Sequence, residues 1–350
     1  MNLEALDFPL PDDRVATHPP DQREDAKLLV ARPGIDEMAH LCFQDFPDIL
    51  RSTDVLVFNN SRVLPARFVA RKSTGGKVEG LWLAERSPEE GECLLIGNRL
   101  KVGQTFETES GALKIQEERQ GGRWIVKSPE GLSWRDFLYL SGSPPLPPYI
   151  RSRRRALGLP EESPEDTDRY QTIWADKGES VAAPTASLHF DTGVIAALAE
   201  KNIASAQLTL EIGPGTFYPV TSRKVQDHTM HAERYEVSLE VRELLAETKG
   251  SGGRVVAIGT TVARVLETIA DGGPLKGETD LFILPGHEFK GVDALLTNFH
   301  TPRSTLLGLV GAFAQHLGAV EGLDWVKSCY GHAIEKEYRF FSYGDCSFWE

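Results

Sequence analysis

The stretch RVVAIGTTVARVLETIA (residues 254–270) joins an apolar run directly to a helical pattern. RVVAIG is typical of a buried strand, and TTVARVLETIA carries apolar residues at helical spacing. DLFILPG (280–286) predicts a strand and a turn, and DVLVF (54–58) predicts another buried strand. STLLGLVGAFAQHL (304–317) predicts an apolar helix capped by Ser304 or Thr305. Alternation of strands and helices indicates an α/β domain.

The segment between residues 66 and 145 has a different pattern. Short strand-like pieces follow one another and are separated by turn residues such as Gly75-Gly76 and Gly121-Gly122. Closely spaced strands without helices between them predict a small β-barrel. We therefore expect a mixed α/β core domain, residues 1–65 and 146–350, interrupted by an inserted β-barrel domain, residues 66–145. The proline-rich and charged segment 141–170 predicts an exposed connector.

The composition is that of an ordinary globular protein, and the net charge of −13 disfavours coating of nucleic acid by bulk charge. The four cysteines are far apart, which is typical of free thiols in a reducing compartment. The acidic N-terminus does not resemble a signal peptide, and no apolar run approaches the ~20 residues of a membrane span. We expect a cytoplasmic protein without membrane contact.

Two loops place a histidine among Pro, Thr and Ser just before a helical pattern. They are VAAPTASLHF (181–190), with His189, and TNFHTPRSTLL (297–307), with His300. Such loops bring backbone donors to a helix N-terminus, where anionic groups bind. The alternative is that each histidine is buried and satisfies nearby backbone groups.

The densest titratable cluster is HTMHAE, with His228, His231 and Glu233. A carboxylate beside a histidine can raise the imidazole pKa and fix its tautomer, as general-base chemistry requires. The spacing does not match a zinc-binding helix, and these groups could instead be ordinary surface polar residues. At the strand-to-helix turn, Gly259, Thr260 and Thr261 offer N–H groups to a carboxylate or a phosphate, although an ordinary N-cap has the same pattern.

Basic residues gather in two places in this acidic chain. One group follows the PPLPPY segment and comprises Arg151, Arg153, Arg154 and Arg155. The other lies at the entrance to the expected barrel and includes Arg62, Arg67, Arg71 and Lys72. Arginine suits phosphate contacts, and small barrels often bind oligonucleotides. The alternative for the first group is a solvated connector neutralised by the acidic run that follows it.

Motifs along nearly the whole chain resemble the S-adenosylmethionine:tRNA ribosyltransferase-isomerase family of queuosine synthesis. They include VLVFNNSRVLPARFVARKSTGGKVE, PPLPPYIR, DRYQTIWA, AAPTASLHF, GPGTFYPV, HTMHAERY, VAIGTTVARVLE, LLTNFHTPRSTLL and YRFFSYGD. The resemblance implies an α/β core with an inserted barrel. It also implies transfer and isomerisation of the ribosyl part of S-adenosylmethionine onto an aminomethyl-deazaguanine base at the tRNA wobble position. The product would be epoxyqueuosine, with adenine and methionine released. Three positions depart from the usual family pattern. This chain has Ser187 where family members usually have Gly, Glu211 where they usually have His, and Pro214 where they usually have Leu.

The resemblance also implies roles for individual residues, with no metal and no cofactor beyond the S-adenosylmethionine substrate. The catalytic candidates are His189, His228, His231, Glu233 and His300. The candidates for binding S-adenosylmethionine are Thr185, Thr216, Phe217, Gly259, Thr260, Thr261 and Arg264. The eight basic residues named above are the candidates for binding tRNA. We expect a monomer without a stable protein partner. Two alternatives remain: a relative that uses a different, non-tRNA acceptor, and a non-catalytic RNA-binding module.

Overall fold

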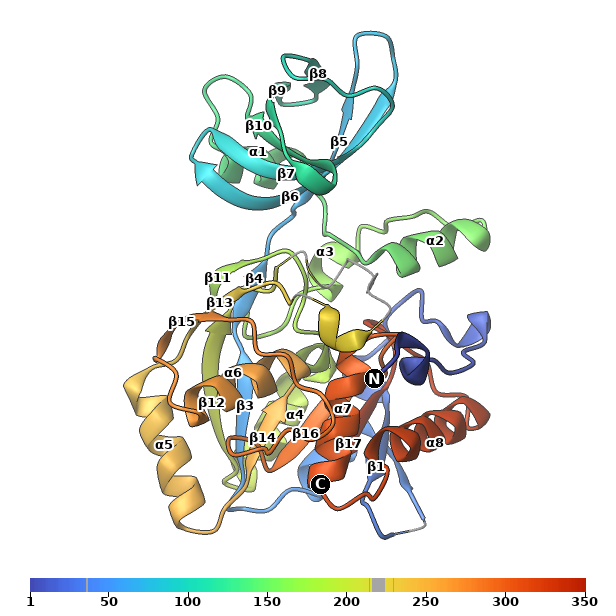
Figure 1. Cartoon of the computed structure of the whole chain (residues 1–350), viewed down its shortest axis with the longest axis vertical. Helices are drawn as coiled ribbons and strands as arrows, with labels where there is room; N and C mark the ends of the chain where they lie inside the picture. Colours follow the sequence, from blue (N-terminus) through green and yellow to red (C-terminus); the bar gives the residue numbers. More distant parts are fainter. Residues whose placement is uncertain (36, 214, 216–223, 229) are drawn as a thin grey trace.

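The computed structural model describes residues 1–35, 37–213, 215, 224–228 and 230–350. Its centre is a nine-stranded sheet in the order β15-β13-β12-β3-β14-β16-β17-β1-β2 (Figure 1). The strands are β1 (Lys27–Ala31), β2 (Ala39–Cys42), β3 (Val55–Asn59), β12 (Ala204–Leu210), β13 (Glu233–Glu236), β14 (Val255–Ile258), β15 (Lys276–Thr279), β16 (Ala294–Asn298) and β17 (Cys346–Trp349). The helices around it are α4 (Thr192–Glu200), α5 (Leu239–Gly250), α6 (Thr260–Ala270), α7 (Thr305–His316) and α8 (Gly322–Glu335).

Both faces of the sheet are covered, which explains the continuous apolar runs in the sequence. In β3, Val55 and Val57 pack with residues of α5, α6, α7 and α8 on one face. Leu56 and Phe58 point to the other face, where they pack with α4 and with the 3₁₀ helix η4 (Phe43–Asp48). The same alternation of side chains holds in β14. The central strands are therefore buried on both sides.

Four neighbouring strands, β12, β3, β14 and β16, run parallel, so their carboxyl ends meet at one edge of the sheet. The expected strand at 280–286 is wrong, because the chain leaves the sheet after Thr279. There Thr279 Oγ1 accepts the Leu281 amide at 3.2 Å, and the Leu281 carbonyl accepts Nε of Arg264 at 2.9 Å. The expected helix at 304–317 is confirmed as α7, and its N-cap is Ser304, whose hydroxyl accepts the Leu306 amide.

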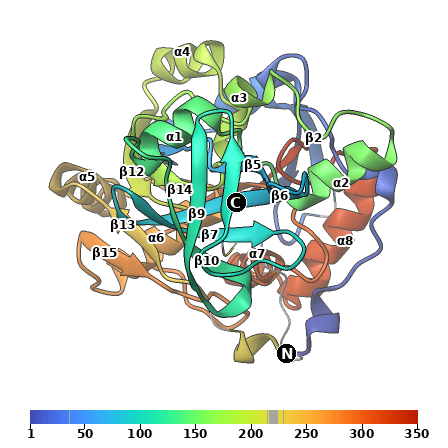
Figure 2. The same cartoon turned by 90° about the horizontal axis from the view of Figure 1, so that it is seen from above.

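The segment after β3 forms a closed six-stranded barrel beyond the carboxyl edge of the sheet (Figures 1 and 2). Its strands are β5 (Arg67–Arg71), β6 (Lys77–Ser87), β7 (Glu90–Ile96), β8 (Thr105–Thr108), β9 (Gly111–Glu118) and β10 (Arg123–Lys127). Helix α1 (Trp134–Ser141) contributes Trp134, Phe137 and Leu138 to the barrel core. A short parallel pair, β4 (Ser61–Val63) with β11 (Lys177–Ser180), lies between the barrel and the large sheet. The predicted fold class, an α/β protein with an inserted barrel, is confirmed.

The expectation of an exposed connector at 141–170 holds for residues 155–160, which are exposed, but not for the whole segment. The segment forms α2 (Pro148–Ala156) and α3 (Asp166–Arg169). Arg154 is only 1% exposed, and its guanidinium binds both carboxylate oxygens of Asp166, at 2.6 and 2.9 Å. Tyr343 donates its hydroxyl to the same carboxylate at 2.9 Å. Two of the charges that predicted solvation, Arg154 and Asp166, instead neutralise each other inside the protein.

We predict that Asp166→Asn destabilises the fold by about 3–5 kcal/mol, because Arg154 is left buried without its counter-charge. Burial alone raises the pKa of Asp166, but hydrogen bonds from Arg154, the Ser163 amide and Tyr343 bring it below its usual value. The contribution of the pair is therefore present above about pH 4 and is lost as the pH falls through the folded-state pKa. Urea unfolding at pH 7 and at low pH measures both effects. Asp271→Asn, which breaks an exposed pair with Lys290, should leave stability unchanged.

Candidate functional site

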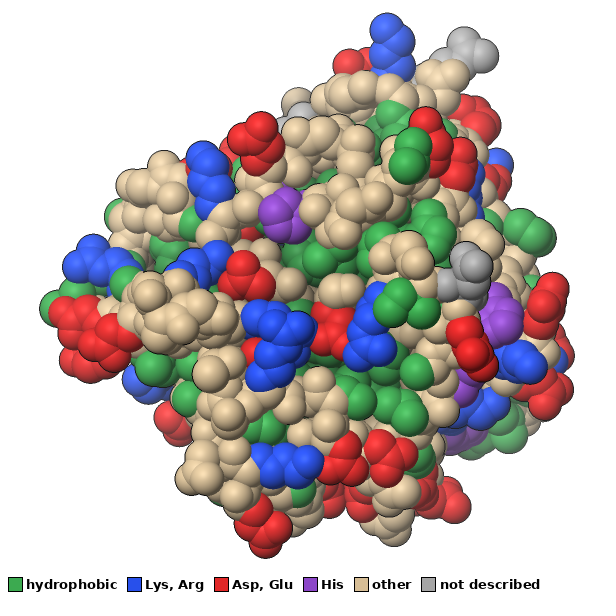
Figure 3. All heavy atoms as spheres, turned by 90° about the horizontal axis from the view of Figure 1, so that it is seen from below, with side chains coloured by type: hydrophobic (Ala, Val, Ile, Leu, Met, Phe, Trp, Pro, Cys, Tyr) green, Lys and Arg blue, Asp and Glu red, His purple; other side chains and the backbone are tan. Residues whose placement is uncertain are grey.

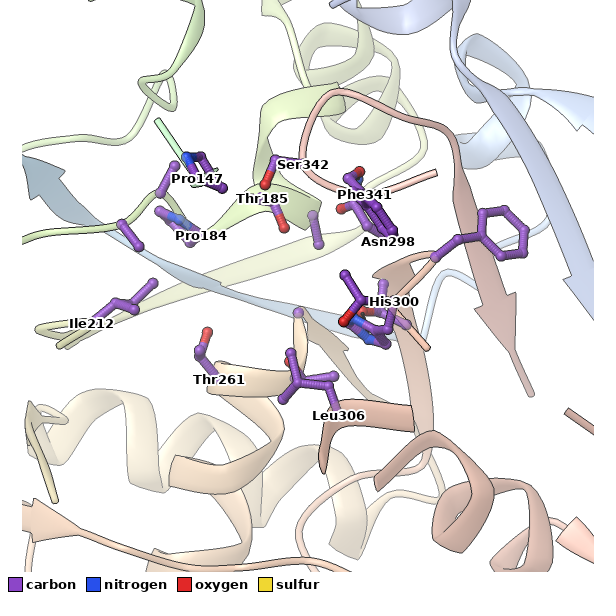
Figure 4. Close-up of a pocket in the computed structure, with 18 of the residues that line it drawn as sticks. Pro147, Pro184, Thr185, Ile212, Thr261, Asn298, His300, Leu306, Phe341 and Ser342 are labelled. Atoms are coloured by element: carbon purple, nitrogen blue, oxygen red, sulfur yellow. Dashed lines mark hydrogen bonds between the residues drawn. The ribbon is translucent and has the colours of Figure 1, made fainter. Parts of the chain in front are cut away.

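The main candidate site is a cavity at the carboxyl edge of the parallel strands, the usual place for ligands in open α/β sheets (Figure 4). Segments far apart in the sequence meet there. They are the connector before α2, the 3₁₀ helix η6 (Thr185–His189), the turn after β14, the turn after β16, and the loop before β17. The residues that line it include Pro147, Tyr149, Tyr170, Ala183, Thr185, Ile212, Gly259, Thr260, Thr261, Asn298, His300, Ser304, Leu306, Phe341 and Ser342.

Two helix N-termini open onto this cavity. Helix α6 begins after Gly259, which has φ +99°, and Thr260 and Thr261 form its first turn. Helix α7 begins after Ser304. Amide groups of a first helical turn have no partner within the helix and carry partial positive charge. The cavity therefore suits an anionic group such as a carboxylate, as the sequence predicted for Gly259, Thr260 and Thr261.

His300 lines the cavity as a neutral imidazole. Its Nε2 and Oγ1 of Thr297 are joined by a hydrogen bond of 3.1 Å, and its amide donates to Oη of Tyr330 at 3.2 Å. Burial lowers the pKa of His300 to about 3. An imidazole with so low a pKa is a weak base, so it suits hydrogen bonding to a ligand better than removal of a proton.

His189 lies outside the main cavity. It is 3% exposed at the end of η6, and its ring is 5.3 Å from that of Phe43. Burial lowers its pKa to about 3. It faces a small hollow together with Arg23 and Tyr343. The structure therefore separates His189 from His300, and Nε2 of His189 is buried without a hydrogen-bond partner.

A second hollow adjoins the first and shares Thr261, Thr301, Ser304 and Leu306 with it. His228, His231, Glu233 and Arg264 line this second hollow. Burial, and secondarily the charge of His231, lowers the pKa of His228. A Cβ atom on Gly215 would come within 2.9 Å of the His231 ring, so the Gly215 backbone lies against the imidazole. The predicted residues Thr216 and Phe217 lie outside the described residues.

Glu233 and Arg264 form a buried ion pair between these hollows and the sheet. The guanidinium Nη1 lies 2.6 Å from Oε2 of Glu233, and Nε donates to the Leu281 carbonyl. The other carboxylate oxygen of Glu233 accepts the Gly213 amide at 3.0 Å. Both carboxylate oxygens of Glu233 are therefore engaged inside the protein. Glu233 thus holds the Gly213 backbone, and Arg264 holds Glu233.

A third hollow lies between the barrel and the core and reaches the main cavity at Ile212. We call it the acidic cleft, because six glutamates and three arginines line it. These residues are Glu85, Glu92, Glu179, Glu211, Glu233, Glu278, Arg123, Arg135 and Arg234. Burial raises the pKa of the half-buried Glu211, one of the residues that depart from the usual family pattern.

The sequence reasoning missed an aromatic wall of the main cavity. Tyr149 lies in the first turn of α2, Tyr170 directly follows α3, and Phe341 comes from the loop before β17. The Tyr149 hydroxyl is hydrogen-bonded to Oγ of Ser342, and burial raises its pKa to about 12, which keeps the phenol neutral. The motifs PPLPPYIR, DRYQTIWA and YRFFSYGD contain Tyr149, Tyr170 and Phe341 in turn, but nothing in these motifs shows that the three residues meet.

Several of the basic residues predicted to bind tRNA are engaged inside the protein. Arg154 binds Asp166, and the buried Arg67 lies 2.9 Å from Glu79. Arg151 binds both Glu79 and Glu161 at 2.8 and 2.6 Å. The prediction that Arg67 and Arg154 face RNA is therefore wrong, because surrounding groups enclose their guanidinium groups. These pairs tie β5 and β6 of the barrel to α2.

The other five basic candidates have at least partly accessible side chains. Arg62, Arg71 and Arg155 are exposed, whereas Lys72 and Arg153 are partly buried. Arg155 pairs with Glu161 at 2.6 Å, and Arg153 lies 3.6 Å from Asp12. On the end of the molecule remote from the barrel, basic and acidic side chains are interspersed (Figure 3). That end offers no large basic field to a polyanion.

The fold and these hollows define an enzyme of the α/β class with an inserted barrel, built around a cavity at the carboxyl edge of its sheet. The family model described as queuosine biosynthesis protein matches residues 3–349, so the chain belongs to that family. Two relatives named S-adenosylmethionine:tRNA ribosyltransferase-isomerase come from Pelobacter propionicus and Acidithiobacillus ferrooxidans. The first is 42% identical to this chain over 100% of both chains. The second is 42% identical over 99% of this chain and 97% of its own length.

A solved structure supports the same family. The S-adenosylmethionine tRNA ribosyltransferase of Thermotoga maritima is 30% identical to this chain, with a TM-score of 0.54. The alignment covers 99% of this chain and 100% of that one. The relatives' names support a transferase/isomerase enzyme. No helix in the described part of the chain is long and apolar enough to cross a membrane.

We predict that Gly259→Ala destabilises the protein by about 1–3 kcal/mol, because its backbone conformation favours glycine. The same change should weaken binding of S-adenosylmethionine, since it shifts the first turn of α6. There is room for the new methyl group, 3.6 Å from Cβ of Ala186, so the effect comes from the backbone.

Thermal unfolding and equilibrium dialysis with S-adenosylmethionine measure the two effects. Gly331→Ala in α8 is the control, because it adds a methyl group in open space on a helical backbone. This control should be neutral or slightly stabilising. Equal stability and equal affinity in Gly259→Ala would contradict a role for the turn.

Proposed function

We propose that this protein transfers and isomerises the ribosyl part of S-adenosylmethionine onto an aminomethyl-deazaguanine base at the wobble position of tRNA. The product is epoxyqueuosine, and adenine and methionine leave. Membership of the queuosine biosynthesis family supports this reaction, as do the relatives' names. The observation that carries the proposal is the convergence of α6, α7 and the aromatic wall on one cavity.

The cavity fits the chemistry of the sulfonium substrate. The helix N-termini suit the carboxylate of the methionine part. Thr185, Thr261 and Ser342 supply hydroxyl groups, and the aromatic wall supplies flat apolar surface for adenine or for the acceptor base. His300, as a neutral imidazole, adds a hydrogen-bonding group without a charge that would repel the sulfonium cation.

The reaction begins with removal of a proton from the ribose carbon beside the sulfonium, which needs a positioned base. We assign this role to His231. It lies in both the second hollow and the acidic cleft, next to the main cavity. His189 and the partly buried His300 have pKa values near 3, and Glu233 is held by Arg264.

Proton transfer, positioning and electrostatics account for every step, so we propose that S-adenosylmethionine is needed as substrate and that no further cofactor is. We also propose that the chain acts in the cytoplasm as a monomer. Light scattering of the purified protein, alone and with tRNA, tests the monomeric state.

The decisive experiment incubates purified protein with S-adenosylmethionine and tRNA that carries the aminomethyl-deazaguanine base. We expect adenine and methionine to appear together, in equal amounts, with the mass of the modified nucleoside increased by the transferred ribosyl group. Unmodified tRNA is the control and should release neither product. Binding of the tRNA without release of adenine or methionine would contradict the proposal.

We predict that His231→Gln lowers kcat by about 10²–10⁴-fold, the usual contribution of a general base. The affinity for S-adenosylmethionine should stay within a few-fold, since the substitution removes the proton acceptor and not the binding cavity. His316→Gln is the control, because His316 ends α7, away from the hollows. If His231→Gln keeps the full kcat, another residue is the base.

A further inference from the structure

Tyr139 is unusual among the aromatic side chains of this protein. Of the Phe, Tyr and Trp residues that the structure describes, it alone is exposed, with 53% of its surface accessible. It lies in the last turn of α1, whose other aromatic residues, Trp134 and Phe137, are buried in the barrel core. The exposed ring of Tyr139 does not serve that core and is accessible to a ligand.

The ring of Tyr139 lines a groove where the barrel joins the core; we call this the Tyr139 groove. Arg62 lies in the same groove, and its exposed guanidinium donates one hydrogen bond, of 2.8 Å, to the Ala175 carbonyl. Ile173, 43% exposed, adds apolar surface. Tyr170 belongs both to this groove and to the main cavity, so the groove lies next to the proposed reaction site.

Charge distinguishes this groove from the acidic cleft, the other hollow at the barrel. The Tyr139 groove is lined by Arg23, Arg62 and one acidic residue, Asp168, whereas glutamates outnumber arginines in the acidic cleft. The acidic cleft repels a polyanion, whereas the Tyr139 groove accepts one. Arg135 lines the acidic cleft and Tyr139 lies one helical turn further along α1, so the two hollows flank the same helix.

We propose that the Tyr139 groove binds single-stranded RNA next to the nucleotide that enters the main cavity. Tyr139 stacks on a flanking base and Arg62 contacts a phosphate. Single-stranded RNA is commonly recognised in this way, by unstacked bases lying on aromatic rings beside arginine. This inference rests on the proposed function, because it takes the RNA substrate to be the anticodon loop of the tRNA.

The test compares Tyr139→Ala, Tyr139→Phe and Leu140→Ala in the full-length protein. Leu140 is the next residue of α1, is 66% exposed and does not line the groove. Fluorescence anisotropy with the labelled anticodon stem-loop measures RNA affinity. We expect Tyr139→Ala to weaken RNA binding roughly 5- to 100-fold, as for one stacked base. Tyr139→Phe and Leu140→Ala should bind like the wild type.

A second measurement concerns Arg62. Arg62→Ala should weaken RNA binding and reduce the slope of log K against log salt by about one, as for the loss of one phosphate contact. The affinity for S-adenosylmethionine should stay unchanged in all these variants, which shows that they are folded.

RNA affinity that is equal in Tyr139→Ala and in the wild type would overturn the inference. So would equal losses in Tyr139→Ala and Leu140→Ala, because general damage to α1 would explain them. Failure of the proposed function looks different. In that case the wild type releases no adenine with any tRNA, while the dependence of RNA binding on Tyr139 can still be measured.

Discussion

The parallel pairing of β12, β3, β14 and β16 is the constraint on which the site depends. Because these strands run in one direction, the turns that follow β14 and β16 are forced to the same edge of the sheet. Burial on both faces leaves these strands little freedom to shift, since a one-residue slip would exchange the two faces. The N-termini of α6 and α7 are therefore held beside the same cavity.

Charge pairing inside the protein is the second organising influence. The net charge of −13 conceals buried pairs such as Arg154 with Asp166, Arg264 with Glu233 and Arg254 with Asp54. Arg151 of α2 pairs with Glu79 of β6, which also pairs with Arg67 of β5, so these pairs join the barrel to α2. They fix the barrel relative to the core at the point where the hollows open. Arginines that suggest RNA contacts in the sequence thus help to build the site.

Part of the site could be predicted because its residues lie in turns at the ends of clear strands. Thr185, Thr261 and His300 were named from local pattern and motif, and they line one cavity. His189 has the same local pattern as His300, yet it lies against Phe43 outside that cavity. The composition of a loop does not predict which way a side chain faces. The aromatic wall was missed because Tyr149 and Phe341 are brought together only by the packing of α2 on the final loop.

The sequence by itself determined the fold class, the inserted barrel, the family and the turns that carry polar groups. Each of these depends on local periodicity or on motifs that stand together in the chain. The tertiary structure decided which arginines are enclosed, that Glu233 is held by Arg264, and that Tyr139 alone among the described aromatic residues is exposed. These outcomes depend on distances between residues that are remote in the sequence, and such distances follow only from the packing of the whole chain.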